Sequence, residues 1–223
     1  MTRGRRAKMP ALRAASAVPL MALIGSVVLS ACGLEASAGA GQVLFQDDFS
    51  RSLSGWDRHH DAVYEADYHL DLYAIQVNPA NTDAWSTPGL NFGDVLVQVE
   101  ASKAEGTDDN LFGVICRYQD PRNFYFFVIS SDGYAGIGVN KEGRRQLLSG
   151  EALLPSTAVR QGQAGNVVRA DCLGYDLRLY INGVLVAEAQ AAEWPAGDVG
   201  MIAGTYDTPG VRIYFDNFSV VQP

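Results

Sequence analysis

Apolar and polar residues alternate with a period of two along most of the chain from residue 43 to its end. This period places successive side chains on opposite faces of a strand, and the segments are rich in Val, Ile, Tyr and Phe. Gly, Asn, Asp and Pro separate the segments, as they do in short turns. About 180 residues of this kind predict one all-β domain, an antiparallel two-sheet β-sandwich. We expect strands at residues 43–49, 94–104, 111–120, 123–131, 134–140, 166–174, 175–183, 184–190, 199–205 and 211–221.

Two neighbouring segments depart from the alternation. Residues 111–120 and 123–131 are apolar on both faces, which predicts central strands. A two-layer sandwich covers only one face of each strand, so the other face is either roofed by loops or kept as a groove. We expect any ligand to bind on this second, concave face.

Aromatic side chains near these strands are candidates for sugar binding. Sugar rings stack their C–H faces on aromatic rings, and polar groups beside the rings fix their orientation. Core packing is the alternative role for the rings, and an ion pair with Asp120 or Asp171 is the alternative for the arginine. The candidate ligand-binding residues are Trp85, Arg117, Tyr125 and Tyr134.

The first 31 residues have the composition of a secretory signal peptide. Five basic residues and no acid precede an apolar run that ends in small residues. The residues from Leu29 to Cys32 resemble a bacterial lipobox, which implies cleavage before Cys32 and lipid attachment to it. Residues 32–42 are predicted to be a lipidated flexible tether. The expected location is extracytoplasmic, with the lipid on a bacterial membrane. The alternative is an ordinary signal peptide with an incidental cysteine.

Loss of the signal peptide would make the chain strongly acidic. The whole chain has 17 basic and 25 acidic residues, and residues 1–31 hold five of the basic ones and none of the acids, which leaves a net charge of −13. This charge argues against nucleic acid as a partner and against electrostatic docking on anionic lipid. The lipid on Cys32 would have to provide the membrane contact.

The two remaining cysteines, Cys116 and Cys172, are predicted to form a disulfide. Compartments outside the cytoplasmic membrane permit such bonds. In the chain-entropy model, closing the loop between these residues stabilises the fold by about 4 kcal/mol. Two buried free thiols are the alternative.

Three stretches carry a resemblance to a known family: residues 112–138, 166–186 and 211–220. They resemble the concanavalin A-like lectin/glucanase superfamily, in particular its laminin-G-like and 3-keto-disaccharide-hydrolase-like branches. The resemblance covers residues 43–222 and implies a jelly roll for the domain at 43–223. This fold hosts lectins, enzymes and plain interaction modules, so it leaves the function open.

The segment YEADYHLDLY carries a row of polar residues at every second position: Glu65, Asp67, His69 and Asp71. An unbroken strand would place these four side chains on one face, as paired carboxylates in a glycosidase require. The resemblance instead implies a hairpin with its turn at 66–67, which would break the row and leave Asp67 exposed and non-catalytic. Tyr68, Leu70 and Leu72 would then point inward.

The resemblance also implies a structural Ca²⁺ between the first and last strands. Asp48 and Asp216 would approach each other there and supply the hard oxygen ligands that calcium prefers. The alternative is that both acids cap strand ends or hold loop amides.

The sequence therefore predicts a cell-envelope lipoprotein whose sandwich binds carbohydrate or another envelope component without catalysis. A glycoside-processing enzyme is the first alternative, and a structural envelope lipoprotein is the second. The polar row offers no convincing acid/base pair, and a Gly-x-Ser-x-Gly nucleophile motif does not occur in the sequence.

Overall fold

The structure is a computed structural model and describes residues 41–223. The predicted signal peptide at 1–31, the lipidation of Cys32 and the tether up to residue 40 lie outside the described residues. None of the described residues forms a helix of the length and apolarity that a membrane crossing needs. The strands are β1 (Val43–Asp47), β2 (His59–His60), β3 (Tyr64–His69), β4 (Leu72–Val77), β5 (Asp83–Ser86), β6 (Val95–Gly106), β7 (Asn110–Asp120), β8 (Asn123–Ile129), β9 (Tyr134–Lys141), β10 (Arg144–Leu147), β11 (Leu154–Pro155), β12 (Asn166–Leu173), β13 (Asp176–Ile181), β14 (Val184–Gln190), β15 (Asp198–Thr205) and β16 (Val211–Val221).

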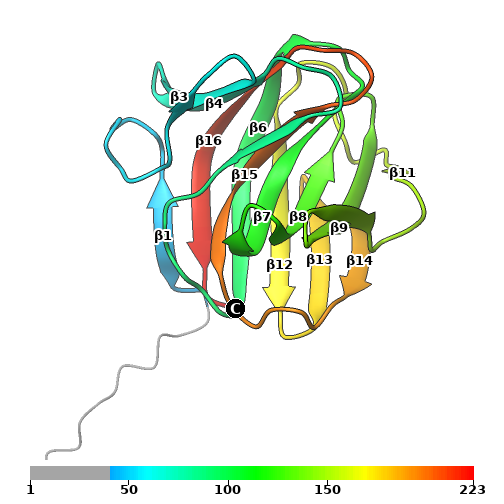
Figure 1. Ribbon diagram of the computed structural model, residues 1–223. Helices are drawn as coiled ribbons and strands as arrows, with labels where there is room; N and C mark the ends of the chain where they lie inside the picture. The colour runs from blue at the N-terminus through cyan, green and yellow to red at the C-terminus, as the bar shows by residue number, and fades with distance from the viewer. Residues whose placement is uncertain (1–40) are drawn as a thin grey trace, which may run out of the picture. The chain divides into compact units, whose positions relative to one another are not determined.

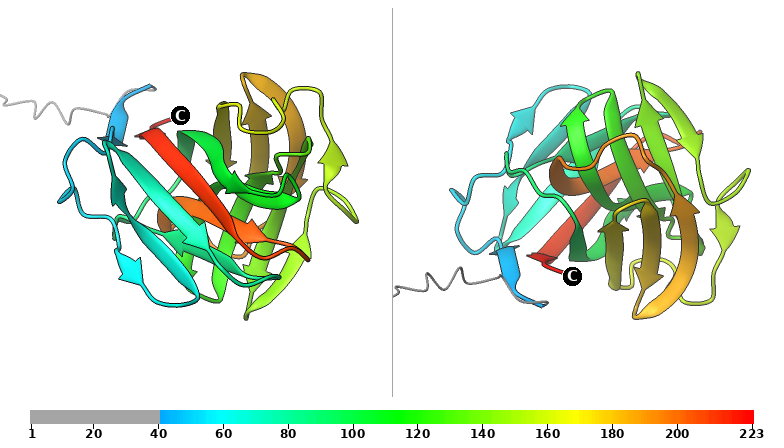
Figure 2. Two further views of the ribbon diagram at one scale, coloured as in Figure 1. Left: turned by 90° about the horizontal axis from the view of Figure 1, so that it is seen from above. Right: turned by 90° about the horizontal axis from the view of Figure 1, so that it is seen from below.

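These strands form two antiparallel sheets that stack face to face (Figures 1 and 2). Sheet A has the order β14-β13-β12-β6-β16-β4-β3-β2, and β1 also pairs with β16. Sheet B has the order β10-β9-β8-β7-β15-β5, and β11 also pairs with β9. The predicted all-β, antiparallel two-sheet sandwich is confirmed.

Burial along the strands follows the sequence pattern. In sheet A, β4, β6, β13 and β16 alternate between buried and more exposed residues, as expected for strands with one face on the core. In sheet B, β7, β8, β9 and β15 are buried on both faces over nearly their whole length. The central position predicted for 111–120 and 123–131 is confirmed.

The main core lies between the sheets and extends to one end of the sandwich. Trp56 is buried there against Phe49, Tyr73 and Phe218. The Asp47 carboxylate accepts a hydrogen bond from the Trp56 indole N–H at 2.9 Å and another from the hydroxyl of Ser54. These contacts fix the loop between β1 and β2.

A disulfide between Cys116 and Cys172 joins the two sheets. Cys116 lies on β7 of sheet B and Cys172 on β12 of sheet A, with a Cα–Cα distance of 6.9 Å. Both residues are fully buried. The predicted disulfide is confirmed.

The hairpin of β3 and β4 turns four residues later than predicted. Its turn is at Leu70 and Asp71, which have φ angles of 49° and 61°, and not at residues 66–67. Leu70 is 85% exposed and Leu72 lies on the face of β4 opposite to the buried Tyr73, so the predicted inward positions of these two side chains are wrong. Tyr68 packs against the core, as predicted. The inward residues of β4 are Tyr73, Ile75 and Val77.

Candidate functional site

The face of sheet B that points away from the core carries a second apolar cluster. Five side chains rim this cluster and keep it from solvent: Trp85, Tyr118, Leu147, Leu153 and Tyr206. The face is therefore largely roofed and is not an open groove. The buried members are Leu111, Ile115, Phe124, Phe126, Val128 and Ile202.

Glycines in the sheet make room for the large side chains above it. A Cβ atom on Gly138 would overlap the ring of Phe126, and one on Gly204 would overlap the carboxylate of Asp83. The ring and the carboxylate thus lie flat on the backbone of the neighbouring strand.

An ion pair connects the two edges of sheet B across this face. Arg145 on β10 pairs with Asp83 on β5, and its guanidinium carbon lies 5.4 Å from the ring centroid of Phe126. The Asp83 side chain is 8% exposed and that of Arg145 is 39% exposed, so only the carboxylate of the pair is buried.

This ion pair shows that the face is concave. Five strand spacings of about 4.8 Å would separate β10 and β5 by about 24 Å in a flat sheet. The two side chains together reach only about 10 Å. Sheet B must therefore curl until its edges approach each other over the second cluster.

A depression of about 630 Å³ adjoins the cluster, and we name it the Tyr134 depression. Tyr206 and Leu153 belong to both its wall and the rim of the cluster. Tyr134 is 40% exposed and stands at the start of β9. The wall consists of Asp109, Ser130, Asp132, Tyr134, Ala152, Leu153, Tyr206 and Asp207.

Charges of both signs act on Tyr206 in the wall of the depression. Burial raises the pKa of Tyr206, Arg145 lowers it, and the weaker effects of the Asp109 and Asp132 carboxylates raise it. Ser130 donates its hydroxyl hydrogen to the carboxylate of Asp132. The wall thus offers two tyrosine rings together with carboxylate acceptors for hydroxyl groups.

Two of the predicted ligand residues lie on this side of the sheet. Tyr134 lines the depression, and Trp85 stands on β5 with its ring centroid 5.1 Å from that of Phe124. The sequence interpretation missed Tyr206, although the period of two continues through it from Ile202 and places both side chains on one face.

The other two predicted ligand residues are buried, so the predicted groove floor is wrong. Tyr125 has no exposed surface, and its hydroxyl accepts the Glu193 amide N–H at 3.0 Å. It alternates with Phe124, Phe126 and Val128, which are the residues of β8 in the outward-facing cluster.

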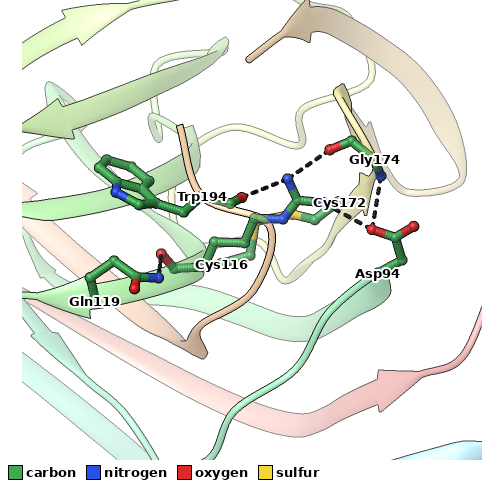
Figure 3. The surroundings of a disulfide bond; sticks show 7 residues. Asp94, Cys116, Gln119, Cys172, Gly174 and Trp194 are labelled. Atoms are coloured by element: carbon green, nitrogen blue, oxygen red, sulfur yellow. Dashed lines mark hydrogen bonds and ion pairs between the residues drawn. A yellow bond between two sulfur atoms is a disulfide. The ribbon is translucent and has the colours of Figure 1, made fainter. Parts of the chain in front are cut away.

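Arg117 is 2% exposed and directly follows Cys116 of the disulfide. Its partners Asp94, Gly174 and Trp194 lie around this bond (Figure 3). The Arg117 guanidinium donates to the carbonyls of Gly174 and Trp194 at 2.7 and 2.9 Å and to Asp94 at 3.0 Å. The expected ion pair therefore exists, but with Asp94 in place of Asp120 or Asp171.

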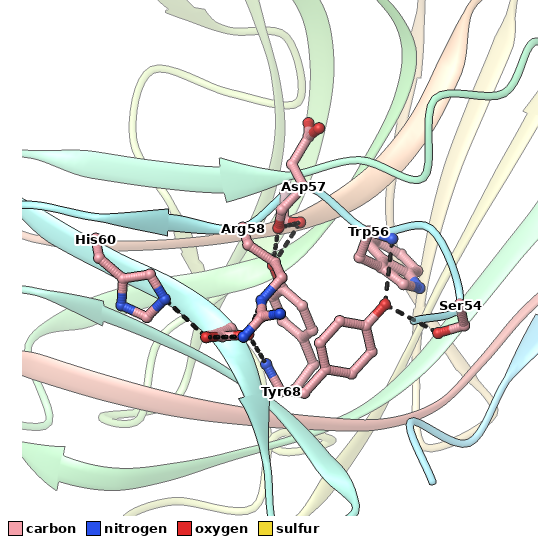
Figure 4. Close-up of polar contacts among 9 residues, drawn as sticks. Ser54, Trp56, Asp57, Arg58, His60 and Tyr68 are labelled. Carbon is pink, nitrogen blue, oxygen red and sulfur yellow. Dashed lines mark hydrogen bonds and ion pairs between the residues drawn. The ribbon is translucent and has the colours of Figure 1, made fainter. Parts of the chain in front are cut away.

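Asp67, in the polar row on β3, is held by ion pairs, and its side chain is 19% exposed, so the predicted exposed turn position is wrong. Arg58 donates to Asp67 at 2.5 and 2.8 Å, and the His60 ring nitrogen lies 2.7 Å from the same carboxylate (Figure 4). Burial alone would raise the pKa of Asp67, but the bonds from Arg58, the Tyr68 amide and His60 outweigh it and lower the pKa. A carboxylate held deprotonated in this way is unsuited to general acid catalysis.

The two predicted calcium ligands hold neighbouring backbone. Asp48 accepts bonds from the amide and hydroxyl of Ser50, and Asp216 accepts the amide N–H of Asn217. Within residues 41–223, no three His, Cys, Asp or Glu side chains converge as a metal site. Calcium binding at Asp48 and Asp216 stays a prediction.

The chain is similar to solved structures in its fold, whereas comparison of its sequence with known families and curated proteins finds no match. No protein-family model and no curated protein matches the chain. The carbohydrate-binding module CBM66 from Bacillus subtilis superposes with a TM-score of 0.61 at 12% identity, over 76% of this chain and 96% of that one. A β-glucanase from Bacillus licheniformis superposes with a TM-score of 0.55 at 11% identity, over 83% of this chain and 99% of that one. The fold is a concanavalin A-like jelly roll.

A further structure contains a similar fold within a longer chain. The GH43 protein BlXynB from Bacillus licheniformis matches with a TM-score of 0.58 at 12% identity, over 80% of this chain and 39% of that one. Identities this low establish the fold alone. The chemistry must be argued from the Tyr134 depression of this jelly roll.

Proposed function

We propose that the protein is a carbohydrate-binding module whose site is the Tyr134 depression. The observation that carries the proposal is the pairing of two tyrosine rings with three carboxylates around one hollow of about 630 Å³. This volume lies within the range of about 300–1,000 Å³ that is usual for ligand sites.

The chemistry of the wall matches that of a sugar. Tyr134 and Tyr206 present ring faces and hydroxyls, so they can pack against C–H groups and exchange hydrogen bonds at the same time. Asp109, Asp132 and Asp207 can accept hydrogen bonds from sugar hydroxyls. The carbohydrate-binding module among the structural neighbours supports the same ligand class.

The site acts without catalysis in this proposal, because Asp67, in the polar row of β3, is engaged by ion pairs. Asp67 is paired with Arg58 and His60. The second candidate function, glycoside hydrolysis, is favoured by the three aspartates in the depression and by the glucanase neighbour.

The proposal includes an extracytoplasmic location, with the chain held to a bacterial membrane through lipid on Cys32. The Cys116–Cys172 disulfide supports export, because such bonds persist in oxidising compartments.

The experiment is a glycan-binding screen of the purified protein with a hydrolysis assay on the same samples. The panel contains mixed-linkage β-glucan, xylan, mucin O-glycans and sialylated glycans, and reducing ends are counted after incubation. We expect binding to at least one glycan, loss of that binding in Tyr134→Ala, and no new reducing ends. Binding that survives Tyr134→Ala contradicts the assigned site, and release of reducing ends establishes the enzyme alternative.

A further inference from the structure

The loop between β10 and β11 is fixed to β9 on both sides. The hydroxyl of Ser149 accepts the amide N–H of Ile137 at 2.9 Å, and Leu154 pairs with Ala135 where the loop ends. These contacts hold the loop beside the Tyr134 depression. Two of its residues form part of the wall of the depression: Ala152 and Leu153.

Gly136 of β9 leaves the space in which Leu153 lies. The register of β11 on β9 places Leu153 opposite Gly136. A Cβ atom on Gly136 would be only 2.6 Å from Cδ2 of Leu153, so the two atoms would overlap. Gly136 does not have a positive φ angle, so the contact with Leu153, and not the backbone conformation, requires a glycine here.

The same space brings Leu153 close to Tyr134. Tyr134 and Gly136 are two residues apart on β9 and therefore face the same side of the sheet, with Cα atoms about 7 Å apart. Leu153 is half-buried against the second apolar cluster, so part of its side chain is available to a ligand. Without this space, Leu153 would have to leave its position in the wall.

The wall of the depression therefore has an apolar part and an acidic part, which come from different loops. Ala152 and Leu153 belong to the loop between β10 and β11. A tyrosine ring is flat and suits the C–H face of a sugar ring, whereas the branched end of a leucine suits a small apolar group such as a methyl. The acidic part consists of Asp109 between β6 and β7, Asp132 between β8 and β9, and Asp207 between β15 and β16.

We propose that Leu153, held in place by the space at Gly136, is a specificity-determining residue that selects glycans carrying a methyl group on a sugar ring, as 6-deoxyhexoses do. The proposal rests on the proposed function. In a 6-deoxyhexose a methyl group replaces the hydroxymethyl group, while the ring hydroxyls stay free to donate to the carboxylates. The extra hydroxyl of a hexose would lie against Leu153 and lose its hydrogen bonds to water. Gly136 is a positioning residue, because it acts through Leu153.

The test measures the affinities of matched methyl glycosides by calorimetry on the purified protein. The probes are L-fucose against L-galactose, L-rhamnose against L-mannose, and D-quinovose against D-glucose, and the members of each pair differ only in one hydroxyl. We expect the wild type to bind the 6-deoxy member of at least one pair about tenfold more tightly. Leu153→Ala should bring the two affinities within about threefold of each other.

Further variants separate positioning from a loss of stability. Gly136→Ala should remove the preference in the same way, because Leu153 is displaced. The double variant Gly136→Ala/Leu153→Ala relieves the overlap and should behave like Leu153→Ala alone, so the two effects are not additive. Leu90→Ala is the matched control, because Leu90 is 39% exposed between β5 and β6, outside the depression, and its loss should leave the preference unchanged. Melting temperatures identify any variant that has lost its fold.

The outcomes separate this proposal from the one on which it rests. Equal binding of both members of every pair, or binding of another glycan of the panel without binding of any pair, overturns methyl selection and leaves the carbohydrate site intact. A preference that persists in folded Leu153→Ala also overturns it, and one that persists in folded Gly136→Ala overturns the positioning role. Failure of every probe and of the whole glycan panel to bind the wild type overturns the proposed function, and this proposal with it.

Discussion

Removal of the disulfide should cost the domain a large part of its stability. The perturbation is the double variant Cys116→Ala/Cys172→Ala, which leaves no unpaired thiol at this point. The cysteines are 56 residues apart in the sequence, and the chain-entropy model gives about 4 kcal/mol for a loop of this size. At 2–4 °C per kcal/mol for a domain of this length, the melting temperature should fall by about 8–16 °C.

The position of the bond supports an effect of this size. It joins β7 to β12, so without it the two sheets are held together only by packing and by loop contacts such as those of Arg117. Alanine at two fully buried positions also removes packing atoms, which adds to the loss.

The assay is thermal unfolding with and without a thiol reductant. The wild type should lose stability when reductant is present during unfolding, and the variant should not respond. A fall of less than about 3 °C in the variant would refute the argument. A variant that still responds to reductant would show that the assay does not report on this bond.

The remaining predictions concern separate parts of the chain. Arg117→Met should lower the free energy of unfolding by about 2–4 kcal/mol in urea, because two loop carbonyls lose their donor. Asp67→Asn should leave any hydrolytic activity unchanged and should destabilise the protein at pH 7. The lowered pKa of Asp67 means that its contribution is present above the ordinary value of 3.8 and is lost as the pH falls through the lowered value, so the difference in stability between wild type and variant should shrink on acidification below 3.8. A sialylated glycan should bind about tenfold more weakly than its neutral counterpart. The three carboxylates of the depression, at roughly 8 Å from the sialic acid carboxylate in water, repel it by about 1.5 kcal/mol in total. The variant Asp132→Asn should bind the sialylated glycan about twofold more tightly than the wild type does. Mass spectrometry of the mature protein should find a diacylglycerol-modified Cys32 at the N-terminus, and an unmodified N-terminus elsewhere would contradict the lipid anchor.

The fold could be predicted from the sequence because each strand carries its own signal. Period-two alternation defines which face of a strand is buried; β6 follows it up to its exposed end, and β16 follows it on both sides of a bulge at Asp216 and Asn217. The doubly apolar segments of β7 and β8 likewise identified central strands. The disulfide followed from compartment and cysteine number.

The hairpin of β3 and β4 shows where local pattern fails. Ala66 and Asp67 are ordinary strand residues here, whereas Leu70 and Asp71 adopt positive φ angles, which are uncommon for Leu and better tolerated by Asp. The inward packing of Tyr73, Ile75 and Val77 fixes the register and overrides the turn preferences.

Only Trp85 and Tyr134, two of the four predicted ligand residues, lie on the outward face of sheet B, because local pattern does not fix which face of a strand points outward. Sequence places Tyr125 on a strand with two apolar faces but does not say which of these faces meets the other sheet. The structure turns Tyr125 inward and Phe124 outward. The Arg145–Asp83 pair depends on the curl of a whole sheet, and residues 62 positions apart carry no local signal of their contact.

Calorimetric titration of the glycan selected by the screen, against wild type, Tyr134→Ala and Tyr175→Ala, tests the central claim most directly. Tyr175 is a matched control because it is 69% exposed and lies in the turn between β12 and β13, outside the depression. We predict that Tyr134→Ala weakens binding by about 1–3 kcal/mol at an unchanged melting temperature, while Tyr175→Ala binds like the wild type. Equal affinities for all three proteins would contradict the assignment of the Tyr134 depression as the carbohydrate site.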